Sequence, residues 1–209
     1  MEKILKKIKP GKEEEKRFMQ ATASFLKALN AALAAKGAKA ILGGSGAKGT
    51  WLSGSHDVDI FVLFDLKKHE DKSGELSDLL EKALQKAFST TKIRRVHGSR
   101  DYFQLTYQGL AFETVPILKI SNAEQARNIT DISPLHSAWV EKHAARLKDD
   151  IRLLKQFCKA NGLYGAESYI GGFSGYVLEI LTAYYGSFEK VLQAAQRWKE
   201  KDVVDPSRF

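Results

Sequence analysis

Two aspartates, Asp57 and Asp59, stand one residue apart at the start of the apolar run DVDIFVLF. The run predicts a β-strand over residues 58–64, in which alternate side chains point to the same face. The two carboxylates would then lie side by side, and their mutual repulsion would oppose ionisation unless a cation neutralised it. Mg²⁺ favours a few carboxylates together with substrate phosphates. The pair therefore predicts a magnesium site that activates an attacking hydroxyl and stabilises a leaving oxygen.

A third acidic residue, Glu113, lies inside the apolar segment LAFETVPIL. An isolated buried glutamate is destabilising, so this side chain should either face solvent at a sheet edge or share a cation. Taken singly, a D-x-D pair is most often a surface feature at a strand start, and Glu113 is most simply an edge residue. Taken together, the three carboxylates favour one shared site.

A glycine-rich segment, GGSGAKGTW, precedes the aspartates. Glycine allows backbone N–H groups to approach a triphosphate closely, and the N-terminus of a helix attracts an anion. Gly44 and Ser45 are therefore candidates for phosphate contacts, and Lys48, one turn later, would add positive charge. The spacing is not that of a Walker A loop. A glycine-rich loop is a weak signal alone, but its position beside the aspartate pair strengthens it.

Hydrophobic periodicity predicts the elements that must position these residues. Helices are expected over 13–36 and 76–88, strands over 38–42, 58–64, 101–107 and 110–117, and a solvated loop over 65–75. From about residue 121 the pattern changes to helices only, over 134–145, 148–160, 173–185 and 188–198, separated by glycines. We therefore expect an α+β fold, with a mixed sheet flanked by helices over 1–120 and an all-helical segment over 121–209.

The amino-acid composition indicates which broad class of protein this chain belongs to. The 209 residues are 44% hydrophobic and 28% charged, as in a soluble globular protein, and no apolar run approaches the length of a membrane span. The single cysteine, Cys158, excludes an intrachain disulfide and favours a reducing cytosol, where we expect a packing role for it. The net charge of +8 suits a polyanionic partner, although an ordinary basic surface explains it equally well.

The segment GSGAKGTWLSGSHDVDIFVLF resembles the nucleotidyltransferase signature of the DNA polymerase β superfamily, in the form found in archaeal-type (class I) tRNA CCA-adding enzymes. The similarity continues through TVPIL, ISPLHSAWV and RLLKQFCKANGLYGAESYIGGFSGYVLEILTAYYGSF, so it covers about residues 40–200. It implies a catalytic nucleotidyltransferase domain over 1–120 and a helical domain over 121–209 that contributes to nucleotide binding. It also implies a cytoplasmic, Mg²⁺-dependent enzyme that adds CMP and AMP, from CTP and ATP, to the 3′ end of tRNA without a template.

The resemblance assigns roles residue by residue. Asp57 and Asp59 would hold the metal, and Glu113 would be the third carboxylate, which polarises the attacking 3′-hydroxyl. The nucleotide-binding residues would be Gly44, Ser45, Lys48, His136, Lys155 and Tyr164. Without the family, Lys155 would be a solvated helix lysine, His136 a capping or packing residue and Tyr164 a core residue. Glu113 departs from the aspartate usual in the family, and its extra methylene moves the carboxylate by roughly 1 Å.

Length is the larger departure, because members of that family continue into domains that grip the tRNA. A truncated chain, one subunit of a split enzyme and a minimal enzyme all remain open, and a complementary subunit or self-association is expected to cover the helical segment. Two other functions also stay open. One is nucleotide transfer to another RNA or a small molecule, and the other is an inactive NTP- or tRNA-binding module.

Overall fold

The computed structural model describes residues 1–55 and 57–206, so His56 of the signature-like segment lies outside the described residues. The chain divides into two compact units. The sheet unit comprises Gly11–Ala47 and Ser55–Ser137, and the helical unit comprises Met1–Pro10, Lys48–Gly54 and Ala138–Phe209. This division differs from a single boundary near residue 120, because two N-terminal segments belong with the C-terminal helices and residues 121–137 stay with the sheet.

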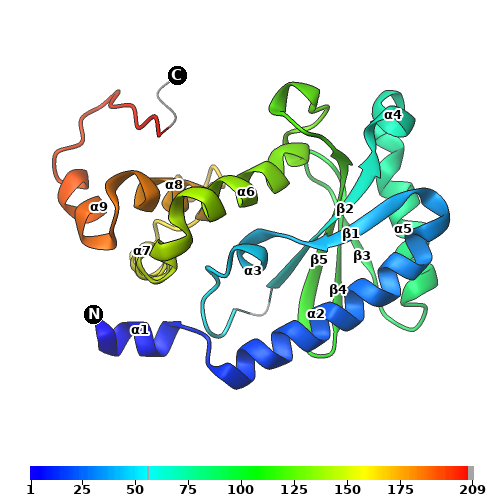
Figure 1. Cartoon of the computed structure of the whole chain (residues 1–209), viewed down its shortest axis with the longest axis horizontal. Helices are drawn as coiled ribbons and strands as arrows, with labels where there is room; N and C mark the ends of the chain where they lie inside the picture. The colour runs from blue at the N-terminus through cyan, green and yellow to red at the C-terminus, as the bar shows by residue number, and fades with distance from the viewer. Residues whose placement is uncertain (56, 207–209) are drawn as a thin grey trace. The chain divides into compact units, whose positions relative to one another are not determined.

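The sheet unit is built on a five-stranded mixed sheet in the order β1-β2-β5-β4-β3 (Figure 1). Its strands are β1 (Ala38–Leu42), β2 (Asp57–Asp65), β3 (Arg94–Val96), β4 (Tyr102–Tyr107) and β5 (Leu110–Lys119). Among the strands of the described residues, β2 and β5 form the only parallel pair in this sheet. The expected α+β fold with a mixed sheet is confirmed. The sequence did not predict strand β3. Two of its three residues are arginine, so it shows no alternation of apolar and polar residues.

Two amphipathic helices, α2 (Lys12–Leu33) and α5 (Leu76–Ala87), pack against one face of the sheet. Three glutamates in the first turn of α2 favour its N-terminus, and its buried side chains recur at helical spacing. Phe25 of α2 stacks on Phe112 of β5 and on Phe88, with ring centroids 4.0 Å and 4.5 Å apart. The helices cover this face, so the polar side chains of the central strands are left on the other.

Short helices complete the sheet unit. They are α3 (Gly44–Lys48), which runs into the helical unit, α4 (Leu66–His69), and the 3₁₀ turns η1 (Ala34–Lys36), η2 (Glu70–Glu75), η3 (Ala123–Gln125) and η4 (Ile129–Ile132). The prediction of a solvated loop over 65–75 is wrong. The Asp65 carboxylate accepts a hydrogen bond from the Lys68 backbone N–H, and this cap begins a helical turn in a segment without apolar periodicity.

The helical unit contains α1 (Glu2–Ile8), the C-terminal part of α6 (Ser133–Ala144), η5 (Ala145–Leu147), α7 (Lys148–Ala160), α8 (Gly175–Tyr185) and α9 (Phe188–Ala195). Its main core consists of Leu154, Cys158, Leu178, Leu181 and Val191. The four helices expected after residue 121 are confirmed. Helix α8 begins later than expected, because the Ser174 hydroxyl caps it by accepting from the Val177 N–H.

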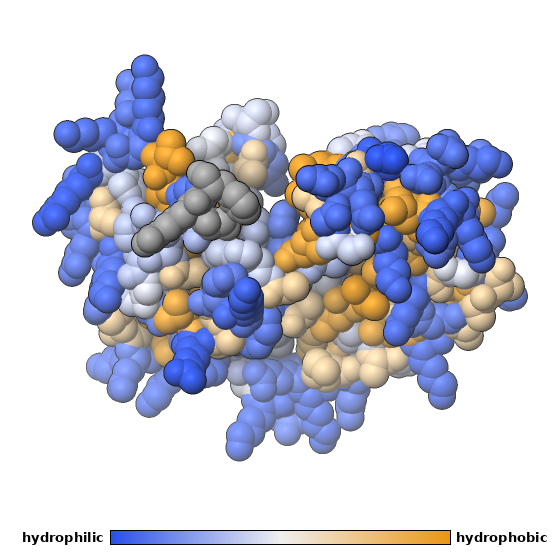
Figure 2. Space-filling model, turned by 45° about the horizontal axis from the view of Figure 1, so that its top comes forward, coloured by the Kyte–Doolittle hydropathy of each residue, from blue (hydrophilic) through white to orange (hydrophobic). Residues whose placement is uncertain are grey.

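The surface is rich in polar residues (Figure 2), as the charged fraction of 28% in the sequence leads us to expect. Hydrophilic residues dominate the face of the molecule in Figure 2, with smaller apolar areas between them. Lysine and arginine outnumber aspartate and glutamate by 33 to 25. In the part of the chain that the structure describes, no helix has the length and apolar character needed to cross a bilayer.

Candidate active site

The carboxylates of Asp57, Asp59 and Glu113 lie on the face of the sheet opposite α2 and α5. Asp59 on β2 is the register partner of Glu113 on β5. Their chain neighbours, such as Val58 and Phe112, are register partners of each other and are fully buried on the helix-covered face. Asp57 is exposed, and it lines the same groove as Glu113. The parallel pairing of β2 with β5 therefore brings the three predicted acidic residues to one surface.

The glycine loop packs directly on this acidic surface. The Gly43 N–H donates to the Asp59 backbone carbonyl over 2.8 Å. A Cβ added at Gly44 would lie 1.7 Å from Asp59 Oδ2, and the Gly44 backbone has a φ of +51°. Only glycine adopts this conformation readily and leaves room for the carboxylate. Ser45 follows Gly44 in the first turn of α3. The glycine loop therefore lies directly against the acidic residues within the sheet unit.

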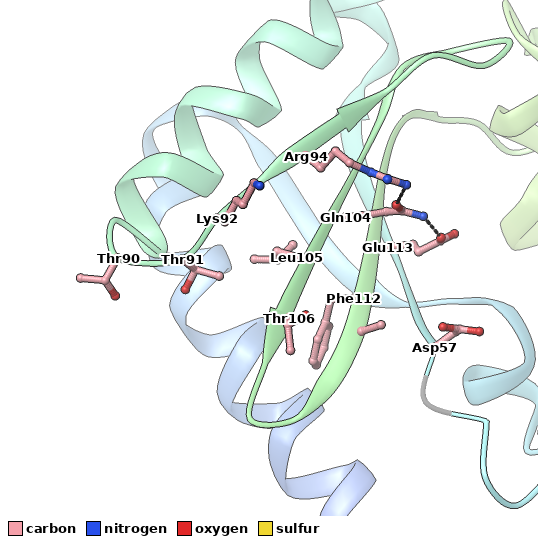
Figure 3. Close-up of a pocket in the computed structure, with 11 residues that line it drawn as sticks. Asp57, Thr90, Thr91, Lys92, Arg94, Gln104, Leu105, Thr106, Phe112 and Glu113 are labelled. Carbon is pink, nitrogen blue, oxygen red and sulfur yellow. Dashed lines mark hydrogen bonds between the residues drawn. The ribbon is translucent and has the colours of Figure 1, made fainter.

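A groove of about 640 Å³ opens beside the carboxylates on the β3–β4–β5 side of the sheet (Figure 3). Within it, the Gln104 side-chain amide of β4 donates a hydrogen bond to Glu113 Oε1. The Arg94 guanidinium of β3 donates in turn to Gln104 Oε1 at 2.5 Å. The groove is therefore lined by acidic side chains, Asp57 and Glu113, and by cationic ones, Lys92 and Arg94 (Figure 3).

The acidic surface has a donor set suited to a hard divalent cation. As the side chains stand, the described residues include no group of three His, Cys, Asp or Glu gathered closely enough to hold a metal. Asp59 and Glu113 are nevertheless adjacent across two strands, with Asp57 on the same face and a glycine loop beside them. Mg²⁺ needs only one or two protein carboxylates, because water and phosphate oxygens complete its coordination. The residues fit such an ion.

Two of the predicted nucleotide-binding residues, Lys48 and Lys155, belong to the helical unit and share one buried carboxylate. Lys48 Nζ lies 2.6 Å from Glu179 Oε2, and Lys155 Nζ lies 2.7 Å from Glu179 Oε1. The Thr50 hydroxyl donates to Glu179 Oε1 over 2.7 Å. Lys155 is 3% exposed and Glu179 is fully buried, so Lys155 is not a solvated helix lysine.

The two lysines determine the charge state of Glu179. Burial alone raises the pKa of this carboxyl, but the charges and hydrogen bonds of Lys155 and Lys48 outweigh burial and hold the pKa below its usual value. The carboxylate is therefore ionised at neutral pH and pairs with both lysines, while burial lowers the pKa of Lys155 against the opposing effect of the Glu179 charge.

The remaining predicted residues are partly buried and lie in different units. His136 is on α6 in the sheet unit. Tyr164 of the helical unit packs against the Leu154–Val191 core, and Lys159 Nζ lies 5.1 Å from its ring centroid. Cys158 belongs to the same core, and burial raises the pKa of its thiol, in keeping with a packing role. Of the predicted residues, Gly44, Ser45, Asp57, Asp59, Glu113 and His136 lie in the sheet unit, and Lys48, Lys155 and Tyr164 lie in the helical unit.

Three residues at these locations were outside the sequence prediction: Arg94, Gln104 and Glu179. A signal existed for two of them. The Gln108-Gly109 turn pairs Tyr107 with Leu110, and counting back along both strands places Gln104 opposite Glu113. Glu179 is the lone acidic residue of the apolar helix GYVLEILTAYY, which marks it as a buried charge in need of a partner. No comparable pattern marks Arg94.

The chain is similar in sequence to known nucleotidyltransferases. Residues 149–209 match the family described as tRNA nucleotidyltransferase, second domain. The chain is 44% identical to the CCA-adding enzyme of Nanoarchaeum equitans over 164 residues, which cover 78% of this chain and 40% of the relative. It is 37% identical to the CCA-adding enzyme of Sulfolobus acidocaldarius over 213 residues, covering 99% and 49%. The chain spans about half the length of the curated relatives it matches.

Solved structures share the fold at lower identity. A cytoplasmic RNA terminal U-transferase superposes with a TM-score of 0.59 at 22% identity, covering 88% of this chain and 50% of the other. The Cid1 poly(U) polymerase superposes with a TM-score of 0.61 at 21% identity, covering 88% and 53%. Residues 23–134 match the family described as nucleotidyltransferase domain. This match covers more than half of the 209 residues of the chain. The chain therefore belongs to the nucleotidyltransferase domain family.

Proposed function

We propose that the chain is the catalytic part of a tRNA CCA-adding enzyme, which transfers CMP and AMP from CTP and ATP to the 3′ end of tRNA. The observation that carries the chemistry is the pairing of Asp59 with Glu113, on one face with Asp57 and against the Gly43-Gly44 loop. The choice of tRNA as acceptor rests on the relatives, which are named CCA-adding enzymes and are 37–44% identical in the two cases above.

The reaction we propose is an in-line displacement at phosphorus. The 3′-hydroxyl oxygen of the acceptor forms a bond to the α-phosphorus, the bond from that phosphorus to the bridging oxygen breaks, and pyrophosphate leaves with the electron pair. Gln104 engages Glu113 Oε1, so Oε2 is the oxygen that would accept the hydroxyl proton. Glu113 thus polarises the attacking group while Asp57 and Asp59 lie beside it on the same face.

Asp57, Asp59 and Glu113 are the residues that would hold Mg²⁺. When bound, the ion would neutralise charge that develops on the phosphate oxygens and lower the pKa of the attacking hydroxyl. Carboxylates that share a cation no longer repel each other, so a bound ion would allow the three acidic side chains of this sheet surface to approach one another.

For the nucleotide we propose contacts from Gly44, Ser45, Lys48, His136, Lys155 and Tyr164. The conformation of Gly44 supports the first of these, because a residue without a side chain lets phosphates approach the loop backbone. The pairing of two lysines with the single carboxylate of Glu179 supports the lysines, because basic side chains outnumber the acidic one and a triphosphate is strongly anionic. We also propose that the helical domain contributes to nucleotide binding and that the chain associates with a complementary subunit or a second copy of itself.

The test is nucleotide incorporation by the purified chain. The acceptors are tRNAs that end in the discriminator base, in C and in CC, each supplied with labelled CTP, ATP, UTP or GTP and Mg²⁺. We expect CMP on the first two acceptors and AMP on the third. Asp59→Asn should lower the rate by at least about 10²-fold, because it removes a charge from the transition-state environment.

Asp65→Asn is the matched control, since Asp65 lies on the same strand and the same face, and asparagine retains its capping of α4. Binding of CTP without Mg²⁺-dependent transfer would contradict catalysis and support an NTP-binding module. Preferential addition of UMP, or equal use of an unrelated RNA, would contradict CCA addition while retaining nucleotide transfer.

A further inference from the structure

We propose that Gln104, oriented by Arg94, is a positioning residue that fixes the carboxylate of Glu113 for attack of the acceptor hydroxyl. This inference rests on the proposed nucleotidyltransferase function. It deepens that function by naming two residues that act through Glu113 rather than on the substrate.

The sheet register puts the residues concerned in one row across four strands. Arg94 on β3 pairs with Gln104 on β4, Gln104 pairs with Glu113 on β5, and Glu113 pairs with Asp59 on β2. Side chains that occupy register positions in neighbouring strands point to the same face and lie within reach of one another. Figure 3 shows the hydrogen bonds that link Arg94 to Gln104 and Gln104 to Glu113.

The chemistry of the two neighbours determines the orientation of the Gln104 amide. A guanidinium carries only donors, so Arg94 must bind the amide oxygen, while the Glu113 carboxylate needs a donor and must bind the amide NH₂. Both demands select the same orientation. Arg94 and Glu113 stand two strands apart, about 9–10 Å between their backbones, and Gln104 lies on the strand between them. A side chain with an acceptor and a donor at its tip can bridge them.

The hydrogen bond from Gln104 matters because residue 113 is a glutamate. Glutamate has one more rotatable bond than aspartate, so its carboxylate can occupy more positions. A misplacement of about 1 Å at a reacting group can lower a rate by about 10²-fold. The hydrogen bond from Gln104 selects one position of Glu113 and leaves its second oxygen for the hydroxyl proton. Arg94 is exposed and its hydrogen bond competes with water, so its contribution is the smaller one.

Gln104→Leu, which keeps the side-chain size and removes the amide, is the principal test in the incorporation assay. We expect kcat to fall by about 10-fold to 10²-fold while KM for the nucleotide stays within about twofold, because Gln104 positions the group that acts on the hydroxyl and does not itself bind the nucleotide. Arg94→Ala should lower kcat by a few-fold. Tyr102→Phe is the matched control, since Tyr102 lies two residues along the same strand on the same face, does not line the groove and should leave kcat unchanged.

Two further variants separate positioning from general damage. Gln104→Glu replaces the amide with a carboxylate that has no N–H to donate to Glu113, so kcat should fall at least as far as in Gln104→Leu. Combining Gln104→Leu with Glu113→Ala should cost no more than Glu113→Ala alone, because Gln104 acts through Glu113. An unchanged kcat in Gln104→Leu, or a fully additive loss in the double variant, would overturn the proposal.

A spectroscopic measurement tests the proposal independently of activity. The ¹H–¹⁵N signal of the Gln104 side-chain amide in the full chain should lie downfield of its position in the Glu113→Ala variant, because a hydrogen bond to a carboxylate deshields the proton. An amide signal that does not move overturns the positioning role, whatever the activity. A chain that transfers no nucleotide while this signal moves would overturn the proposed function and retain the hydrogen bond.

Discussion

At the residue scale, the acidic site depends on close approach of backbone to carboxylate. Asp59 lies beneath Gly44 so tightly that the glycine has no space for a side chain, and its positive φ disfavours any other residue. The Asp59 side chain is thereby confined from above by the loop, while Glu113 flanks it on the next strand. Position 44 therefore requires glycine for two reasons, its backbone conformation and its contact with Asp59.

Gly44→Ala should damage both stability and activity. We expect a loss of about 1–3 kcal/mol in the free energy of unfolding, because the backbone is strained and Asp59 must move. Incorporation should fall by about 10²-fold from the displaced carboxylate. Denaturant unfolding and the incorporation assay measure the two effects. Gly186→Ala is the control, since it shares a positive φ of +87° but has nothing within 4 Å of the added Cβ. Equal effects on activity would show that contact with Asp59 is irrelevant.

At the scale of elements, Glu179 ties α7 and α8 to the segment that follows the glycine loop. It lies on α8, accepts from Lys155 of α7 and pairs with Lys48, 131 residues away in the sequence. Removal of one partner of a buried ion pair leaves the other charge without compensation, which is more damaging than the pair is stabilising. This cluster therefore couples elements that the chain order keeps apart.

Glu179→Gln should lower the free energy of unfolding by about 3–5 kcal/mol at pH 7, because two buried ammonium groups lose their counter-charge. The exposed pair of Glu141 with Lys148, at 3.3 Å, provides the control. Glu141→Gln should change stability by no more than about 1 kcal/mol. Denaturant unfolding of both variants measures the difference. An equal decrease in the free energy of unfolding in the two variants would show that burial of the Glu179 ion pairs does not affect stability.

The same cluster predicts how stability responds to acid. The pKa of Glu179 is lowered in the folded state by its two lysines, so the stability it contributes is complete above the unfolded pKa of about 4.3. That contribution is lost as the pH falls below this value and through the lower folded pKa. Between pH 5 and pH 3 the wild-type chain should lose more stability than Glu179→Gln. Parallel acid sensitivity of the two proteins would contradict the lowered pKa.

At the scale of the whole molecule, the net charge of +8 is the property most relevant to an RNA partner. We expect the affinity of the chain for tRNA to fall linearly on a plot of log K against log salt concentration, because neutralised phosphates release counterions. A hairpin RNA of equal length should show a similar slope if charge dominates binding. Fluorescence anisotropy at several salt concentrations measures both slopes. Binding to tRNA that does not respond to salt would contradict this account.

The sequence by itself determined the local features: helix and strand periodicity, the shared face of Asp57 and Asp59, and the glycine loop beside them. The sequence also contained the information that pairs Gln104 with Glu113. The turn at Gln108-Gly109 fixes the register of the hairpin, and such a turn is a local feature. The tertiary structure decided the parallel pairing of Asp59 with Glu113, the burial of Lys155 against Glu179 and the division into two units. Periodicity is a local signal, whereas partners distant along the chain are chosen by packing of the whole core, which no single segment encodes.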